Sequence, residues 1–277
     1  MNHKLPFEEL SYGKGERQIQ FLHANAHVPE TYRKLLKNIG FTDFKFLLPH
    51  QRPIWPNSDP RELKHWSLLA KDIIAHMDAS NRKGVIGIGH SMGAIATWFA
   101  AVERPDLFSE LVLIDPVILA EQWVKRLRFV PYWMQKRWIP FVKIAVNRRD
   151  HWPDLIALES HLGSKKVYKR FDPEVWEDFK KYAVMNADDG SLQLRYPKAW
   201  EAKVYGSAPN LWPLMKHNPC PITIIKAEYS DVITPEIWDR IHVDMPHAEL
   251  KEIKHTGHLV PFENPAALAS MIKEILN

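Results

Sequence analysis

The chain of 277 residues is long enough for one large domain, or for a core with a smaller appended module. It is 45% hydrophobic and 25% charged, and a net charge of +4 without a basic recognition motif argues against nucleic-acid binding. The single cysteine, Cys220, excludes an internal disulfide framework and favours a reducing compartment. The sequence shows no secretory signal and no run of about 20 apolar residues, so we expect a cytoplasmic globular protein.

Short apolar runs alternate with helical patterns along the first 116 residues, which is typical of a mainly parallel sheet in an α/β protein. Strands are expected at residues 8–12, 17–23, 44–48, 83–88 and 111–114. Helices are expected at residues 32–39, from Asp59-Pro60 to about residues 76–80, and at 94–102.

The alternation stops between about residues 117 and 207, where helical, aromatic and basic segments replace it. It resumes with a strand at 221–225, a helix from Pro235, a strand at 250–253 and a last helix from Pro261 or Asn264. Long interruptions inside a compact domain are usually functional. We therefore predict a core of residues 1–116 and 216–277 with a helical lid, residues 117–215, inserted into it.

The most informative motif is Gly89-His90-Ser91-Met92-Gly93, which lies between an expected strand and an expected helix. A serine at such a sharp turn projects its hydroxyl from the sheet, and the glycines keep Cβ atoms away from the neighbouring backbone. The motif predicts a nucleophile elbow with Ser91 as the nucleophile.

A serine hydroxyl needs a base to take its proton and an acid to orient that base. His258 follows the last expected strand and Gly257 allows a tight turn beside it, so we favour His258 over its neighbour His255. For the acid we favour Asp231, just past the strand that is expected to end near Lys226.

Two other carboxylates remain open as the acid. Glu228 lies close by, but it is better suited to hold a loop amide. Asp115 ends the preceding strand and could reach the same imidazole from another side, although a cap on the Pro116 turn is the simpler interpretation.

Acyl transfer also needs hydrogen-bond donors for the oxyanion. The backbone amide of Met92 is one candidate, at the start of the elbow helix. The amide of Asn25, in the loop after the second expected strand, is the other. The Asn25 side chain either lines the pocket or fixes its own loop.

These motifs together resemble the alpha/beta-hydrolase superfamily in its capped, lipase/esterase-like branch, and the resemblance covers essentially the whole chain. It implies a mainly parallel twisted sheet with helices on both faces, a lid inserted after the sixth strand, and hydrolysis through an acyl-serine intermediate. Ala24 and Ala26 depart from the glycines that are frequent in the oxyanion loop of that superfamily.

Tryptophan is concentrated in the lid, where part of it must form the core of a small module and part is expected to roof the substrate pocket. We assign five residues to the pocket: His23, His90, Trp55, Trp123 and Trp152.

The first third of the lid, residues 117–149, contains eight lysines and arginines against one acid, Glu121. A solvated basic face is the simpler interpretation. Peripheral contact with an anionic membrane surface is the other.

We therefore predict a serine hydrolase that cleaves a small-molecule carboxylic ester with an apolar acyl or alcohol portion. The alternatives are a carbon–carbon hydrolase or a thioesterase on the same triad, or a non-catalytic ligand-binding protein. The serine at position 91 disfavours an alkyl-enzyme mechanism, which needs aspartate there. No metal and no cofactor are expected, and the oligomeric state stays open.

Overall fold

The computed structural model describes residues 8–277, which are built around a seven-stranded sheet of order β1-β3-β2-β4-β5-β9-β10. β1 (Glu9–Tyr12) pairs antiparallel with β3 (Phe44–Pro49), and all other neighbours are parallel. The remaining strands are β2 (Arg17–Leu22), β4 (Val85–His90), β5 (Phe108–Ile114), β9 (Ile222–Tyr229) and β10 (Glu249–Gly257). The predicted mainly parallel sheet is confirmed.

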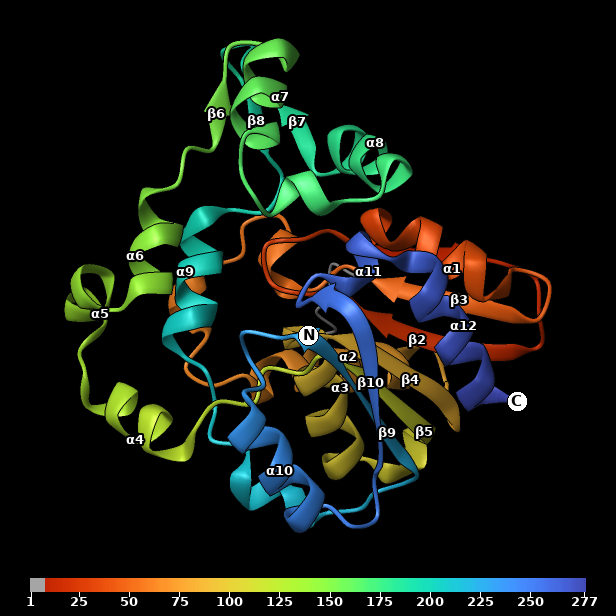
Figure 1. Cartoon of the computed structure of the whole chain (residues 1–277). Coiled ribbons are helices and arrows are strands. Elements are labelled where there is room, and N and C mark those ends of the chain that lie inside the picture. Colours follow the sequence, from red (N-terminus) through yellow and green to blue (C-terminus); the bar gives the residue numbers. More distant parts are fainter. Residues whose placement is uncertain (1–7) are drawn as a thin grey trace.

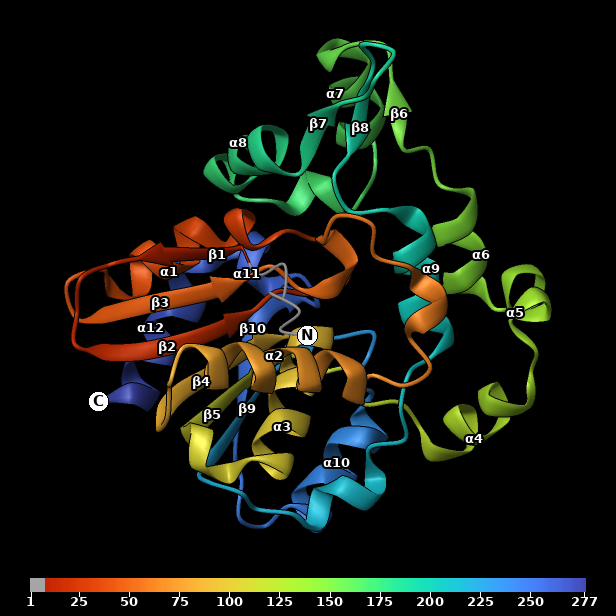
Figure 2. The same cartoon turned by 180° about the vertical axis from the view of Figure 1, so that it is seen from behind.

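Alternation of side chains along the strands produces two separate apolar layers. In β5, Leu111 and Leu113 enter one layer, while Val112 and Ile114 enter the other. The first layer is covered by α2 (Ser67–Ala79), α3 (Met92–Glu103) and α10 (Pro235–Asp244). The second is covered by α1 (Arg33–Gly40), α11 (Val260–Glu263) and α12 (Pro265–Leu276). Helices therefore cover both faces, as Figures 1 and 2 show.

The helix expected from Asp59 begins later than predicted. Asp59 caps only a short 3-10 turn, Pro60–Glu62, by accepting a hydrogen bond from the Arg61 amide (2.8 Å), and α2 starts at Ser67. At the other end of the chain, the Asn264 side chain caps α12 at Ala267 (3.1 Å). The second of the two predicted starts for the last helix is therefore the better one.

A long insertion separates β5 from β9, the fifth and sixth strands of the main sheet within residues 8–277. It therefore follows the fifth strand here, not the sixth. The insertion contains α4 (Glu121–Phe129), α5 (Tyr132–Trp138), α6 (Pro140–Asn147), α7 (Leu155–Gly163), α8 (Pro173–Tyr182) and α9 (Lys198–Gly206). It also forms a small antiparallel sheet from β6 (His151–Trp152), β7 (Val184–Asn186) and β8 (Leu192–Leu194), so it is not purely helical.

The two ends of the insertion are packed differently. The part around α7 and α8 joins the second apolar layer through buried side chains such as Trp152, Leu158 and Phe179. By contrast, α6 and α9 meet at a separate small cluster, whose fully buried side chains are Val142, Ala145 and Ala202. No helix within residues 8–277 has the length and apolar character to span a membrane.

Candidate active site

Ser91 occupies the turn between β4 and α3. Its backbone has φ 56° and ψ −117°, a strained conformation for a residue with a Cβ, and such strain is concentrated at functional sites. The Ser91 amide donates to the carbonyl of Ile114 (3.0 Å), which ties the turn to the end of β5. The structure thus places Ser91 in the strand–turn–helix context that its motif predicts.

Gly89 and Gly93 provide the space that this turn needs. A Cβ on Gly93 would lie 2.3 Å from the carbonyl oxygen of Leu22, and one on Gly89 would lie 2.5 Å from the backbone nitrogen of Ala94. Backbone atoms at such distances cannot rotate away, so both positions require glycine.

His258 follows β10 directly and contacts two of the residues weighed as triad members. Its Nε2 lies 2.9 Å from Oγ of Ser91, and its Nδ1 lies 2.7 Å from Oδ2 of Asp115. An ionised carboxylate only accepts hydrogen bonds, so Nδ1 carries the proton and Nε2 of the neutral ring accepts from the serine hydroxyl. The geometry joins a nucleophile, a base and an orienting acid.

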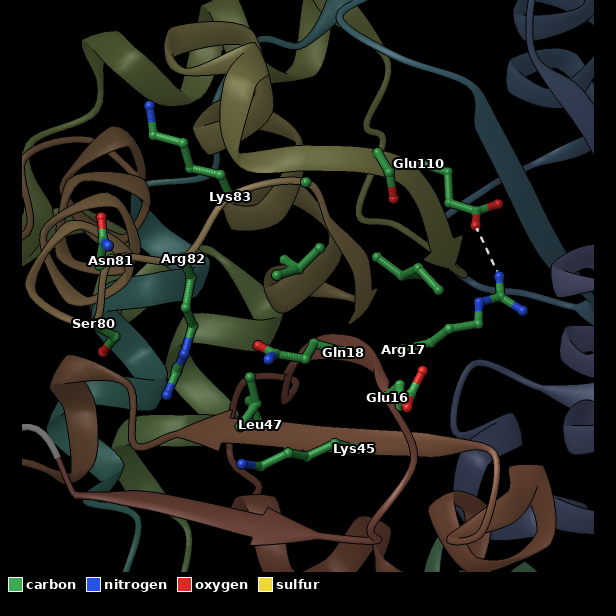
Figure 3. Close-up of a pocket in the computed structure, with 14 residues that line it drawn as sticks. Glu16, Arg17, Gln18, Lys45, Leu47, Ser80, Asn81, Arg82, Lys83 and Glu110 are labelled. Carbon is green, nitrogen blue, oxygen red and sulfur yellow. Dashed lines mark ion pairs between the residues drawn. The ribbon is translucent and has the colours of Figure 1, made fainter.

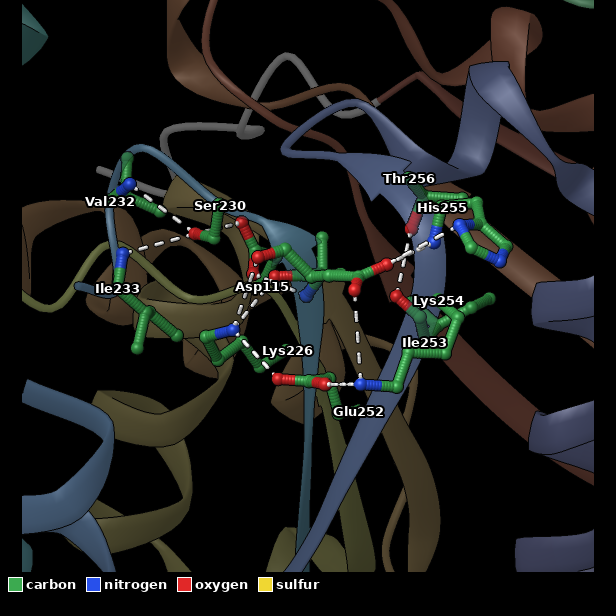
Figure 4. A network of polar contacts seen from close by, with 12 residues as sticks. Asp115, Lys226, Ser230, Val232, Ile233, Glu252, Ile253, Lys254, His255 and Thr256 are labelled. Carbon is green, nitrogen blue, oxygen red and sulfur yellow. Dashed lines mark hydrogen bonds and ion pairs between the residues drawn. The ribbon is translucent and has the colours of Figure 1, made fainter. Parts of the chain in front are cut away.

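The carboxylate of Asp115 is fully buried and held from several sides. Its Oδ1 accepts from the amide of Ala227 (2.9 Å), and its Oδ2 also accepts from the hydroxyl of Ser230 (2.8 Å). The Ser230 hydroxyl oxygen accepts in turn from the amide of Ile233 (3.0 Å), as Figure 4 shows. These bonds fix the carboxylate against His258.

The prediction that Asp231 orients His258 is therefore wrong, and Asp115 takes that position. The strand expected to end near Lys226 continues to Tyr229, and each added residue of a strand advances it by about 3.3 Å. Asp231 is therefore only two residues beyond the end of β9, and its side chain is exposed. Asp115, by contrast, directly follows β5, whose last residue Ile114 pairs with His90 of β4, and so lies beside the elbow.

The alternative base, His255, and the alternative acid, Glu228, both lie outside the triad. The His255 side chain is 86% exposed, so it does not compete with His258 for Ser91. Glu228 accepts a hydrogen bond from the His255 amide (2.7 Å), which is the loop-holding role that the sequence favoured for it.

The pKa of His258 is raised by its acidic surroundings. Burial of the imidazole lowers this pKa, but the hydrogen bond and charge of Asp115 raise it, and the charges of Asp231 and Glu263 add to that effect. The net result is a pKa above the ordinary histidine value of 6.5. Asp231 thus acts on the base through its charge, without a hydrogen bond.

The amides proposed for the oxyanion are free to donate. Within residues 8–277, no protein acceptor takes the amide hydrogens of Met92 or Asn25. The Asn25 side chain is used differently: its Oδ1 accepts from the Tyr196 hydroxyl (2.8 Å), and its Nδ2 donates to the Glu201 carbonyl (3.2 Å). The loop after β2 is thereby fastened to the insertion by Asn25.

His90 connects the loop after β2 to the loop of His258. Its Nε2 donates to the carbonyl of His258 (2.8 Å), so its Nδ1 accepts from the hydroxyl of Tyr32 (2.7 Å), which itself accepts from the amide of Ala24 (3.0 Å). Burial lowers the pKa of His90 well below the ordinary value, which keeps the ring neutral as this chain of bonds requires. The assignment of His90 to the substrate pocket is corrected, because its side chain is fully buried behind the triad.

Two further pocket assignments are also corrected. His23 is fully buried, and its Nδ1 donates to the carbonyl of Ala24 (2.9 Å) beneath the loop after β2. Trp55 donates from Nε1 to the carbonyl of His50 (2.6 Å) and lines a cavity of about 400 Å³ with His50 and Arg195. No member of the Ser91 site lines that cavity.

The two lid tryptophans differ from the prediction in opposite ways. Trp152 is 1% exposed and donates to Nδ1 of His161 (3.1 Å), so it belongs to the core of the insertion. Trp123 on α4 is half exposed and contributes to the outer surface. The sequence placed both residues in the lid, but it contained no signal for whether each ring enters the core of the insertion, faces the pocket or lies on the outer surface.

A second hollow lies at the opposite edge of the sheet from Ser91. It measures about 470 Å³ and is lined by the amino-terminal ends of β2, β4 and β5 (Figure 3). Arg17 and Glu110 form an ion pair there (3.6 Å). Its location excludes it as the site of the Ser91 chemistry.

Within residues 8–277, no group of three or more His, Cys, Asp or Glu side chains is arranged to hold a metal ion. The triad geometry itself requires none.

We expect acid to destabilise the fold through its buried histidines. Burial lowers the pKa of His23 to about 4 and that of His27 to about 3, whereas an unfolded histidine titrates near 6.5. Below that value the unfolded chain binds protons that the folded chain does not. The free energy of unfolding should fall by up to about 1.4 kcal/mol per pH unit for each histidine as the pH drops towards the folded-state pKa.

Urea unfolding at pH 7 and pH 5 measures this loss. His27→Gln should remove its share of the decrease between the two pH values. An unchanged decrease in the variant would contradict the assignment of a neutral, buried His27.

A mainly parallel sheet with a serine elbow after a central strand and a histidine after the last strand defines the alpha/beta-hydrolase class of fold. The sequence profile of the Alpha/beta hydrolase family matches residues 21–271, and the chain therefore belongs to that family. The predicted resemblance and fold class are confirmed.

Several proteins that the chain resembles have names that describe them as hydrolases or esterases. A protein called uncharacterized hydrolase YugF, from Bacillus subtilis, is 26% identical over 219 residues, which cover 75% of this chain and 71% of YugF. Among solved structures, E-2-(acetamidomethylene)succinate hydrolase matches with a TM-score of 0.80 at 19% identity, over 98% of this chain and 94% of that one. An esterase of M. tuberculosis matches with a TM-score of 0.71 at 17% identity, over 98% and 89%. At such identities the solved structures establish the fold alone.

Proposed function

We propose that this protein is a serine hydrolase that cleaves carboxylic esters with an apolar acyl or alcohol portion. The observation that carries the proposal is the continuous set of contacts from Ser91 through His258 to Asp115, at 2.9 and 2.7 Å. The match to a solved esterase is consistent with it.

The reaction follows from these contacts. Oγ of Ser91 attacks the ester carbonyl carbon while its proton passes to Nε2 of His258, and the amides of Met92 and Asn25 donate to the oxyanion. The intermediate collapses, the alcohol leaves with the proton from His258, and the acyl group stays on Ser91. A water molecule, deprotonated by His258, then attacks the acyl-serine, and the acid is released as Ser91 recovers its proton.

The apolar preference rests on aromatic rings close to the triad. The ring of His90 lies 5.2 Å from that of His258 and 6.1 Å from that of Phe262. Phe262 also packs against Phe171 of the insertion (5.2 Å). The rings of His90, Phe262 and Phe171 are buried, so they make the surroundings of the triad apolar without touching the substrate. Apolar surroundings of this kind favour an apolar substrate portion over a charged one.

Covalent labelling combined with a substrate panel tests the proposal. A fluorophosphonate should modify Ser91, located by peptide mass spectrometry, and Ser91→Ala should take up no label. The wild-type protein should hydrolyse p-nitrophenyl esters from acetate to octanoate. If an acyl-CoA were turned over faster than the esters, the protein would be a thioesterase. If a β-diketone were turned over faster, it would be a carbon–carbon hydrolase. Absence of both label and turnover would leave a non-catalytic ligand-binding protein.

A further inference from the structure

Three consecutive helices of the insertion, α4, α5 and α6, expose an unusual number of large apolar side chains. Phe129 is 85% exposed and Trp133 is 71% exposed. Six residues, here called the α4–α6 face, are each more than half exposed: Trp123, Phe129, Trp133, Trp138, Phe141 and Ile144. Exposed apolar groups of this size concentrated on neighbouring elements mark a surface that binds a partner.

The same helices are strongly basic. Lys125, Arg126, Lys136, Arg137 and Lys143 are all exposed. The acid of this segment, Glu121, is 28% exposed and already pairs with Lys125 at 2.9 Å. The guanidinium of Arg137 also lies over the ring of Trp138 (5.9 Å), so a cation and an aromatic ring are adjacent there.

The position of the three helices leaves this surface accessible. In both views of the molecule they follow one another along an outer flank, with α9 between α5–α6 and the central sheet. The inward sides of these helices are formed by other side chains: Val142 and Ala145 of α6 pack with Ala202 of α9, and Val124 and Leu127 of α4 are buried. The apolar rings listed above therefore have no core to enter within the described chain.

We propose that the α4–α6 face docks onto an anionic lipid membrane surface. Tryptophan and phenylalanine rings suit the boundary between headgroups and acyl chains, and lysine and arginine neutralise anionic headgroups. A solvated basic face would account for the charges but not for six exposed large apolar side chains. The charge and the apolar surface together specify a partner that is both anionic and apolar.

A second copy of this chain does not fit the same surface. A two-fold interface brings a patch against itself. Here it would oppose two sets of exposed lysines and arginines, such as Lys136 and Arg137, and like charges across an interface are unfavourable.

Vesicle co-sedimentation of the full chain tests the proposal. The protein should sediment with vesicles of phosphatidylcholine mixed with phosphatidylglycerol, and markedly less with phosphatidylcholine alone or at high salt. Lys136→Glu/Arg137→Glu should weaken binding by at least about 25-fold, since each basic residue at an anionic surface contributes about fivefold. Phe129→Ser/Trp133→Ser should weaken it by about tenfold or more through lost apolar burial.

Matched variants outside the three helices serve as controls. Lys165→Glu/Lys166→Glu makes the same charge change on an exposed part of the insertion, and Ile156→Ser removes a side chain that is 79% exposed on α7. Both should bind like wild type, and circular dichroism should show all variants folded. Failure to sediment with anionic vesicles, equal losses in the control variants, or a wild-type dimer that Trp133→Ser dissociates would each overturn the proposal. Because the assay has no catalytic readout, its outcome is independent of the triad.

Discussion

Asp115→Asn should lower kcat/KM for p-nitrophenyl ester hydrolysis by about 10⁴-fold, whereas Asp231→Asn should stay within about tenfold of wild type. In the part of the chain that the structure describes, Asp115 alone accepts the hydrogen bond from Nδ1 of His258. An asparagine amide in its place no longer fixes the tautomer in which Nε2 can take the serine proton, and it removes the charge that stabilises the imidazolium. Asp231 contributes charge alone, and it is exposed to solvent that screens it.

The pH profile separates the two carboxylates further. His258 must be neutral to act as base, so kcat/KM rises with pH and reaches half its plateau at the pKa of His258 in the free enzyme. That pKa is raised above 6.5, and both Asp115 and Asp231 hold it up. Each substitution should therefore move the midpoint to lower pH, while only Asp115→Asn also lowers the plateau.

The measurement is kcat/KM from pH 5 to 9 for wild type and the two variants, which make the same carboxylate-to-amide change. A plateau that falls for Asp231→Asn and is kept for Asp115→Asn would restore the acid assigned from sequence. The structure would then not represent the catalytic arrangement of the triad.

The reason for that error shows what the sequence contains and what it lacks. Ser91 is identifiable from its motif, which follows the clear apolar run of β4, and His258 from its place beside Gly257 between the last expected strand and the last helix. The acid depended on where β9 ends, and a difference between Lys226 and Tyr229 is within the usual uncertainty of strand boundaries. Asp231 still indicates the correct loop, since its neighbour Ser230 donates to the carboxylate of Asp115.

The pocket residues were harder to predict for a different physical reason. A tryptophan in a module's core, in a pocket or on an outer surface can have the same neighbours and spacing in the sequence. Trp152 is buried and Trp123 half exposed because of how α4 and α7 pack, which depends on contacts between distant segments. The hydrogen bonds of the Asn25 side chain were equally hard to predict, because its partners Tyr196 and Glu201 lie more than 170 residues away in the sequence.

Gly93→Ala should lower the free energy of unfolding by about 3 kcal/mol or more and reduce esterase activity beyond the loss of folded protein. The new Cβ would lie 2.3 Å from the carbonyl oxygen of Leu22 and 2.6 Å from that of His23. These are backbone atoms at the end of β2, so relief requires moving the strand end or the start of α3. The first movement displaces the loop that carries the Asn25 amide, and the second displaces the Met92 amide, so either one disturbs the oxyanion site.

Gly163→Ala is the matched control, because it adds the same methyl group at the end of α7, where no atom of its surroundings lies within 4 Å. Alanine is the better helix former, so this variant should be as stable as wild type or up to about 1 kcal/mol more stable, with unchanged kcat/KM. Urea unfolding and ester kinetics on the three proteins decide the matter. If Gly93→Ala matched Gly163→Ala in both, the elbow would have room for a side chain, and the close approach of α3 to β2 could not be what positions the two amides.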